Sequence, residues 1–263
     1  MMIDTHCHLN FEAYDDDREQ VIQRALQAGV THIINPGVDL PSSRAGLDLS
    51  QQYDGVYAAV GIHPNSTADF APPDLDTIRE LAAENKVVAI GEIGLDYYWD
   101  KSPKDQQFAA FEAQLELAAE LELPVIIHNR EASNDVLRVL ESWVTDLPVS
   151  LKDRLGVLHS FSAPPEIAER ALSIGFYLGF TGPLTFKKAD ELRSIARSMP
   201  QDRILVETDG PFLTPVPYRG KRNEPAYIPH IVDRLASLRQ RSTDEMSTIT
   251  TENAFRLFHR MQW

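Results

Sequence analysis

The chain has 263 residues, of which 43% are hydrophobic and 24% are charged, and its formal net charge is −14. This balance is typical of a globular protein, and the negative charge argues against a protein that coats nucleic acid with its whole surface. The single cysteine, Cys7, and the lack of any apolar run near the roughly 20 residues of a membrane span predict a cytoplasmic protein with no internal disulfide and no membrane partner.

Eight short runs rich in Val, Ile, Leu and Ala alternate with longer charged segments, whose apolar residues recur every three or four positions. The runs predict buried parallel strands and the segments predict helices. In chain order the strands are expected at residues 2–6, 31–36, 57–63, 87–93, 124–128, 155–159, 176–181 and 204–209.

Eight strands of this kind predict an α/β fold, a (β/α)8 TIM-type barrel formed by residues 1–263 as one domain. Residues 242–260 are expected to form an extra C-terminal helical segment packed outside it. An open, doubly wound sheet is the alternative, although no glycine-rich phosphate turn follows the first strand.

Ionisable residues stand at or near the C-terminal ends of five predicted strands. Residues two apart on a strand project to the same side, so the two histidines of "IDTHCHLN" should point together. Active sites of such barrels lie at the C-terminal ends of the strands, where six side chains could meet. These are His6, His8, Glu92, His128, His159 and Asp209.

A lone histidine at a strand end is more often structural, but burying so many ionisable groups around one cavity is costly unless cations compensate. Mixed imidazole and carboxylate ligands favour Zn or Mn over Ca, and Mg remains an alternative. Six ligands are too many for one catalytic zinc, so we predict two divalent metal ions. The first would bind His6, His8 and Asp209, the second His128 and His159, with Glu92 bridging them.

Further residues near these strand ends are candidates for other roles. Asp209 is also expected to accept the proton of the attacking water, and Glu92 to take part in catalysis as the bridging carboxylate. Glu207 is expected to orient a histidine, with a structural ion pair as the alternative. His63 and Arg130 are expected to contact substrate, Arg130 at a phosphate. A hydrogen-bonded rim histidine and a salt bridge at a helix end are the alternatives.

The segment "VPYRGKRNEPAY" concentrates Arg219, Lys221 and Arg222 after the last predicted strand. Beside two cations, this loop would make the mouth of the barrel attractive to a polyanion. The alternative is a solvated loop whose basic residues pair with Glu224 and other acids. Unpaired bases could stack on aromatic residues of the same rim, namely Tyr97, Tyr98, Trp99 and Phe212, although ordinary packing is the alternative for each.

Seven motifs follow one another over essentially the whole chain: "IDTHCHLN", "VGIHPN", "AIGEIGLDYY", "PVIIHNREA", "GVLHSFS", "VETDGPFLTP" and "YRGKRNEPAY". In this order they resemble the TatD family of metal-dependent deoxyribonucleases, within the amidohydrolase-like barrels. The resemblance implies metal ligands at the same six positions and metal-dependent hydrolysis of DNA, in the manner of a 3′–5′ exonuclease. The expected substrate is DNA, single-stranded or at its ends, and RNA is a further candidate.

Other functions remain open on the same barrel. One is metal-dependent hydrolysis of a small cyclic amide, lactone or phosphoester, although many such enzymes bridge their metals with a modified lysine where this chain has Glu92. A non-catalytic scaffold would be expected to have lost ligands, and all six are present. A metal-independent hydrolase would need a nucleophile, and Cys7 is expected to point away from the mouth. No obligate protein partner is indicated.

Overall fold

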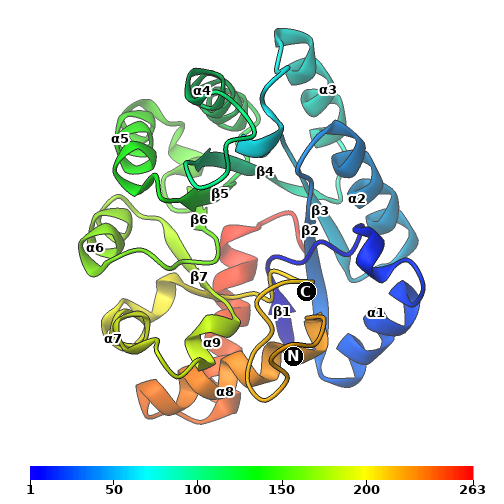
Figure 1. The fold of residues 1–263 in the computed structure, drawn as a ribbon, viewed down its shortest axis with the longest axis vertical. Helices are drawn as coiled ribbons and strands as arrows, with labels where there is room; N and C mark the ends of the chain where they lie inside the picture. Colours follow the sequence, from blue (N-terminus) through cyan, green and yellow to red (C-terminus); the bar gives the residue numbers. More distant parts are fainter. Residues whose placement is uncertain (263) are drawn as a thin grey trace.

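Eight parallel strands stand side by side in chain order, from β1 to β8, in a computed structural model that describes residues 1–262. Helices surround the strands (Figure 1). The ring closes where the segment after β1 meets β8 and the segment that follows it. Thr5 N donates to Val206 O at 3.2 Å, and Asp209 N donates to His6 O at 2.8 Å. The predicted (β/α)8 TIM-type barrel is confirmed.

The strands are β1 Met2–Asp4, β2 Val30–Pro36, β3 Val56–Val60, β4 Val87–Asp96, β5 Val125–Arg130, β6 Gly156–Leu158, β7 Tyr177–Phe180 and β8 Ile204–Val206. The helices are α1 Arg18–Gln27, α2 Leu40–Gln52, α3 Pro72–Ala82, α4 Lys104–Glu120, α5 Ser133–Trp143, α6 Pro165–Ser173, α7 Asp190–Ser198, α8 Ile228–Arg239 and α9 Thr243–Leu257. Two short 3-10 helices beside the site are η2 Pro64–Ser66 and η5 Gly182–Thr185. Each strand begins within one residue of its predicted start. The strand ends differ more, because β4 runs on to Asp96 and β8 stops at Val206.

Two apolar layers hold the barrel together. The larger cluster lies between the strands and the surrounding helices. The second cluster takes at least one residue from every strand, among them Ile34, Ile126 and Leu205, and joins them to the C-terminal end of the chain. Strands buried on both faces account for the near-continuous apolar runs in the sequence.

The C-terminal helix α9 covers the N-terminal end of the barrel, near the centre of the ring in Figure 1. It begins with a capping box, in which Ser242 Oγ accepts from Glu245 N and the Glu245 carboxylate accepts from Ser242 N. Asn253 Nδ2 donates to Ile204 O, at the start of β8, at 2.9 Å. The predicted extra helical segment therefore closes the end of the barrel opposite to the predicted site. Among residues 1–262, no helix is long and apolar enough to cross a membrane.

We expect Phe258→Ala to lower the free energy of unfolding by about 3–5 kcal/mol, since this ring is fully buried in the second apolar cluster. Urea unfolding followed by circular dichroism measures the change. Glu252→Ala, on the exposed face of α9, is the matched control and should change stability by less than about 0.5 kcal/mol. Equal losses in both variants would contradict a packing role for the end of the chain.

Candidate metal centre

The segment after β1 brings two histidines to the mouth of the barrel. Cys7 forms an isolated parallel bridge with Gly210, so the alternation of a strand continues beyond β1. His6 and His8 lie on one side, with their Nε2 atoms 3.2 Å apart. Cys7 points the other way and is fully buried, its Sγ 3.9 Å from Tyr14 Oη. The predicted directions of the histidines and of the cysteine are confirmed.

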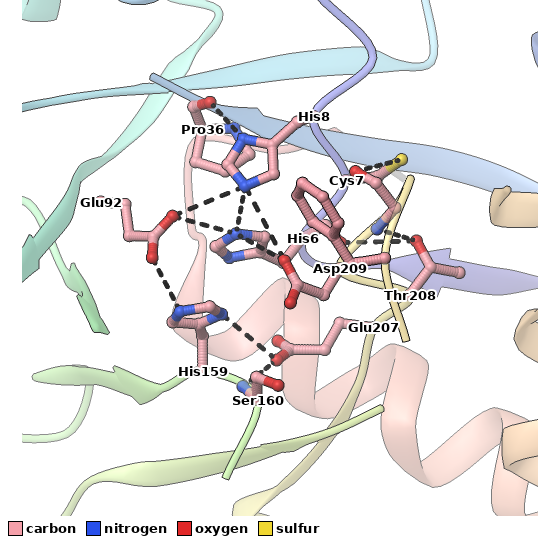
Figure 2. Close-up of polar contacts among 12 residues, drawn as sticks. His6, Cys7, His8, Pro36, Glu92, His159, Ser160, Glu207, Thr208 and Asp209 are labelled. Atoms are coloured by element: carbon pink, nitrogen blue, oxygen red, sulfur yellow. Dashed lines mark hydrogen bonds and ion pairs between the residues drawn. The ribbon is translucent and has the colours of Figure 1, made fainter. Parts of the chain in front are cut away.

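Glu92, on β4, lies among side chains from several strands (Figure 2). Its Oε2 is 3.3 Å from His6 Nε2 and 3.6 Å from His8 Nε2. Asp209 Oδ1 lies 3.8 Å from each of these nitrogens. These two nitrogens and two oxygens form what we call the first donor set.

The other carboxylate oxygen of Glu92 faces away from the first donor set. Oε1 is 2.7 Å from His128 Nδ1 and 2.8 Å from His159 Nε2, and these nitrogens are 3.3 Å apart. These three atoms form the second donor set. All six side chains expected to bind metal are therefore brought together, and Glu92 offers one oxygen to each set.

The spacing within the first donor set fits a divalent cation. Atoms held about 2.1 Å from one ion in tetrahedral geometry lie about 3.4 Å from one another. The separations of 3.2–3.8 Å in the first donor set agree with that spacing. The second set is tighter but presents the same imidazole and carboxylate donors, which suit Zn or Mn. Both sets could therefore hold a metal ion.

Contacts on the far side of two rings determine which nitrogen faces the site with a lone pair. His8 Nδ1 lies 3.2 Å from Pro36 O, and because a carbonyl only accepts, Nδ1 carries the proton. His128 Nε2 lies 3.0 Å from Asp96 Oδ2, and a neutral ring that donates there presents the lone pair of Nδ1 to the second set. Burial alone would lower the pKa of His128, but its contacts with Asp96 and Glu92 raise it in the absence of a cation. A histidine that donates its outer N–H to a carbonyl or carboxylate is typical of metal sites.

His63 has the opposite arrangement. Its Nδ1 accepts a hydrogen bond from Asn65 N at 3.0 Å, at the start of η2, so Nε2 carries the proton. That Nε2 lies 3.5 Å from Glu92 Oε1. Burial, and then the proximity of His128, lower the pKa of His63 to about 3, so the ring is neutral at pH 7. His63 is therefore arranged as a hydrogen-bond donor into the site rather than as a ligand.

The environment acts differently on the members of the first donor set. Burial lowers the pKa of both His6 and His8, so their rings stay neutral at pH 7 and retain a lone pair. Burial alone would raise the pKa of Glu92, but the surrounding histidines, His159 foremost, hold it well below its usual range. Burial raises the pKa of Asp209.

Glu207 lies fully buried behind His159. Its Oε1 accepts from Ser160 N and is 3.8 Å from His159 Nδ1, while Oε2 accepts from Thr5 Oγ1 at 3.3 Å. The missing side chain of Gly179 makes room, because a Cβ there would collide with the Glu207 carboxylate. The carboxylate therefore lies beside the His159 ring, but His159 Nδ1 has no hydrogen-bond partner within residues 1–262, and the role of orienting a histidine stays a prediction.

Asp96 is a site residue that the sequence analysis missed. Besides accepting from His128, its carboxylate accepts from Tyr98 N at 2.9 Å and from Asn65 Nδ2 at 3.2 Å. The signal was present, since Asp96 follows Glu92 by four residues on one strand, but the strand was predicted to end at residue 93. The side chain is nearly fully buried and fixes the His128 ring.

The basic loop after β8 divides into two parts. Arg222 forms a bidentate ion pair with Asp17, with both N···O distances 2.8 Å, which is the structural alternative considered for this residue. Within the described chain, residues 1–262, neither Arg219 nor Lys221 has an ion pair. The Arg219 guanidinium instead lies 3.7 Å from the centre of the Phe186 ring. Two of the three basic residues, Arg219 and Lys221, are therefore available to pair with an anion.

Arg130 lies on the rim of the barrel at the end of β5. Its guanidinium stacks 4.0 Å from the centre of the Tyr98 ring and 5.7 Å from that of Trp99. These two aromatic residues are 50% and 47% exposed, so the cluster offers both a cation and open ring faces. Single-stranded nucleic acid commonly binds to such platforms.

Comparisons with known proteins agree with this geometry. A family model described as TatD related DNase matches residues 3–259. A protein of Bacillus subtilis (strain 168), described as the uncharacterized metal-dependent hydrolase YabD, is 46% identical over 258 residues, 98% of this chain and 99% of the relative. The 3'-5' ssDNA/RNA exonuclease TatD of Erwinia tasmaniensis is 37% identical over 264 residues, covering 98% of this chain and 100% of the relative. The crystal structure of YJJV, a TatD homolog from Escherichia coli K12, is 33% identical, with a TM-score of 0.90 over 98% of both chains.

We expect Asp96→Asn to weaken metal binding at the second donor set by about 10-fold to 100-fold, because the outer partner of His128 loses its charge. Isothermal titration of metal-stripped protein with Zn or Mn measures the affinity. Asp100→Asn is the matched control, an exposed carboxylate four residues farther along the chain. Unchanged affinity in Asp96→Asn would show that this contact is structural.

Proposed function

The chain belongs to the TatD-related DNase family and is a metal-dependent hydrolase, and from this premise we propose that it removes nucleotides from the 3′ ends of single-stranded DNA, and of RNA, with two divalent cations. The observation that carries the proposal is the position of Glu92, with one carboxylate oxygen in each donor set. A carboxylate with one oxygen toward each donor set could bridge a pair of cations about 3.5–4 Å apart.

The cations would be bound by the six predicted ligands and, once bound, would lower the pKa of water and polarise a phosphoryl oxygen. Asp209 directs Oδ1 toward His6 and His8, and its side chain is 15% exposed, so water from the mouth can reach the carboxylate. We assign Asp209 the role of accepting the proton of the attacking water, because its carboxylate faces both the donor set and the open mouth.

His63 supplies a second function from the other side of Glu92. The neutral ring presents Nε2–H to the site, with the side chain 12% exposed. A fixed neutral donor of this kind stabilises negative charge that develops on a phosphoryl or leaving oxygen. His63 therefore acts on substrate, as the sequence analysis expected, although it lies beside the ligands.

The rim supports a nucleic-acid substrate rather than a small ester. Arg130, with the rings of Tyr98 and Trp99, lies on one part of it, and the unpaired Arg219 and Lys221 lie on another. The relative from Erwinia tasmaniensis is named as an exonuclease on single-stranded DNA and RNA, which favours the same substrate class here. With a net charge of −14, the remaining surface would repel a polyanion that does not reach this mouth.

The first test is nucleotide release from 3′-end-labelled and 5′-end-labelled single-stranded DNA by metal-stripped protein that has been resupplied with Mg, Mn or Zn. Stepwise shortening from the 3′ end that requires metal is expected. His128→Ala should abolish it, and His259→Ala, an exposed histidine after α9, should not. Absence of cleavage with every metal would overturn the proposal and direct the search to small esters and amides.

His63→Ala and His128→Ala separate substrate contact from metal binding. We expect His63→Ala to lower kcat by about 10²-fold to 10³-fold, since one preorganised donor is lost, while the metal content stays at that of the unchanged protein. His128→Ala should lose metal together with activity. Plasma mass spectrometry of both proteins gives the metal content, and loss of metal from His63→Ala would contradict the assignment of a donor.

A further inference from the structure

A groove of about 480 Å³ lies outside both donor sets, where α8 packs against α7 and η5. Thr185, Lys187, His230 and Arg234 are among the residues that line it, and we call it the α7–α8 groove. The two helices are neighbours on the outside of the ring (Figure 1). None of the metal-ligand candidates lines this groove.

The α7–α8 groove carries unpaired positive charge. Arg234 Nε is buried and has no hydrogen-bond partner within residues 1–262, and neither Arg234 nor the exposed Lys187 has an ion pair there. Arg193 also lines the groove, but its guanidinium donates to Phe186 O and to Asp190. An anion would satisfy Arg234 where the protein does not.

The one acidic residue among those that line the groove is already engaged. Asp233 Oδ1 accepts a hydrogen bond from Thr243 Oγ1 at 2.7 Å. Asp233 keeps its negative charge, but Lys187 and Arg234 outnumber it even with Arg193 paired to Asp190, so the groove is locally positive on a chain of net charge −14. Such a patch concentrates a phosphate-bearing ligand.

Contacts connect the α7–α8 groove to the mouth of the barrel. Beside His159, Ser160 Oγ lies 3.2 Å from Thr181 Oγ1, and Thr181 directly precedes η5. Thr185, at the other end of η5, lines the groove and accepts a hydrogen bond from Val216 N in the basic loop at 2.9 Å. Phe186, which the Arg219 guanidinium covers, also lines the groove, so a nucleic-acid strand that followed η5 away from the site would lie near Arg219.

We propose that the α7–α8 groove is a phosphate subsite that binds the backbone of a single strand on the 5′ side of the nucleotide being removed. This proposal rests on the proposed function, because a nucleic-acid strand held at its 3′ end must extend from the mouth in the 5′ direction. Arg234, whose side chain is half-buried, supplies one contact and the exposed Lys187 supplies the other. Phosphate contacts of this kind fix position and add affinity without reading sequence.

The test is the affinity of the metal-loaded protein for short labelled single strands whose 3′-terminal linkage is a methylphosphonate that resists cleavage, measured by fluorescence anisotropy. A second neutral linkage is placed at each upstream position in turn. We expect one position, or two adjacent ones, to weaken binding by about threefold to tenfold. In Arg234→Gln the same positions should lose their effect, because the partner of that phosphate is gone.

Lys187→Gln serves as a second variant, since Lys187 is exposed and its loss leaves the packing of α8 intact. It should weaken binding of the fully charged strand and reduce the salt dependence of log K by about 0.7 per lost contact. Lys152→Gln, an exposed lysine before β6 and so at the opposite end of the barrel, is the control and should bind as the unchanged protein does. If Arg234→Gln and Lys187→Gln bind the strand as tightly as the control Lys152→Gln, the subsite is overturned.

The two proposals can fail separately. Nucleotide release that proceeds while Arg234→Gln and Lys187→Gln bind like the unchanged protein would refute the subsite alone. Position-dependent binding without nucleotide release would refute the nuclease and keep the groove as a nucleic-acid site. If the protein binds no single strand, both are wrong. Competition by inorganic phosphate at equal strength with the oligonucleotide would also overturn the subsite, because it would show a site for free anions.

Discussion

The contact on which the rest of the site depends is the shared carboxylate of Glu92. The residue is 3% exposed, and a buried carboxylate is costly unless charge and hydrogen bonds surround it. Its two oxygens lie within 4 Å of imidazole nitrogens that come from segments after β1 and β3, from β5 and from the end of β6. A closed ring of parallel strands brings many strand ends to one point, so the donor sets form only when the barrel closes.

Five histidines meet here, and for three of them the role follows from what lies behind the ring. His8 donates its outer N–H to a carbonyl and His128 donates its outer N–H to a carboxylate, which turns the inner nitrogen of each ring toward the donor sets. The backbone N–H of Asn65 behind His63 does the reverse. Chemically identical side chains a few ångströms apart thereby present either a lone pair or an N–H to the site.

Part of the site could be predicted from the sequence, and part depends on contacts that only the folded chain makes. The strand starts and the six converging side chains followed from apolar runs and strand ends, because parallel strands end at one edge. The extra length of β4 could not be seen, since Gly94 and Leu95 do not distinguish a strand from a loop, and Asp96 was therefore missed. The pairing of Arg222 with Asp17 joins residues some 200 positions apart, and such contacts depend on packing that local sequence does not encode.

The two ends of the barrel differ in the kind of contacts that they contain. At the mouth, Asp209 and Ser160 adopt left-handed backbone with φ of 54° and 44°, and buried carboxylates crowd together. Residues in such conformations persist only where the surroundings hold them in place. At the other end α9 follows the ordinary rules, with a capping box and fully buried rings such as Phe258. The apolar cluster inside the barrel joins this end to every strand, so the packing of α9 helps to hold in place the strand ends that carry the unfavourable charges of the mouth.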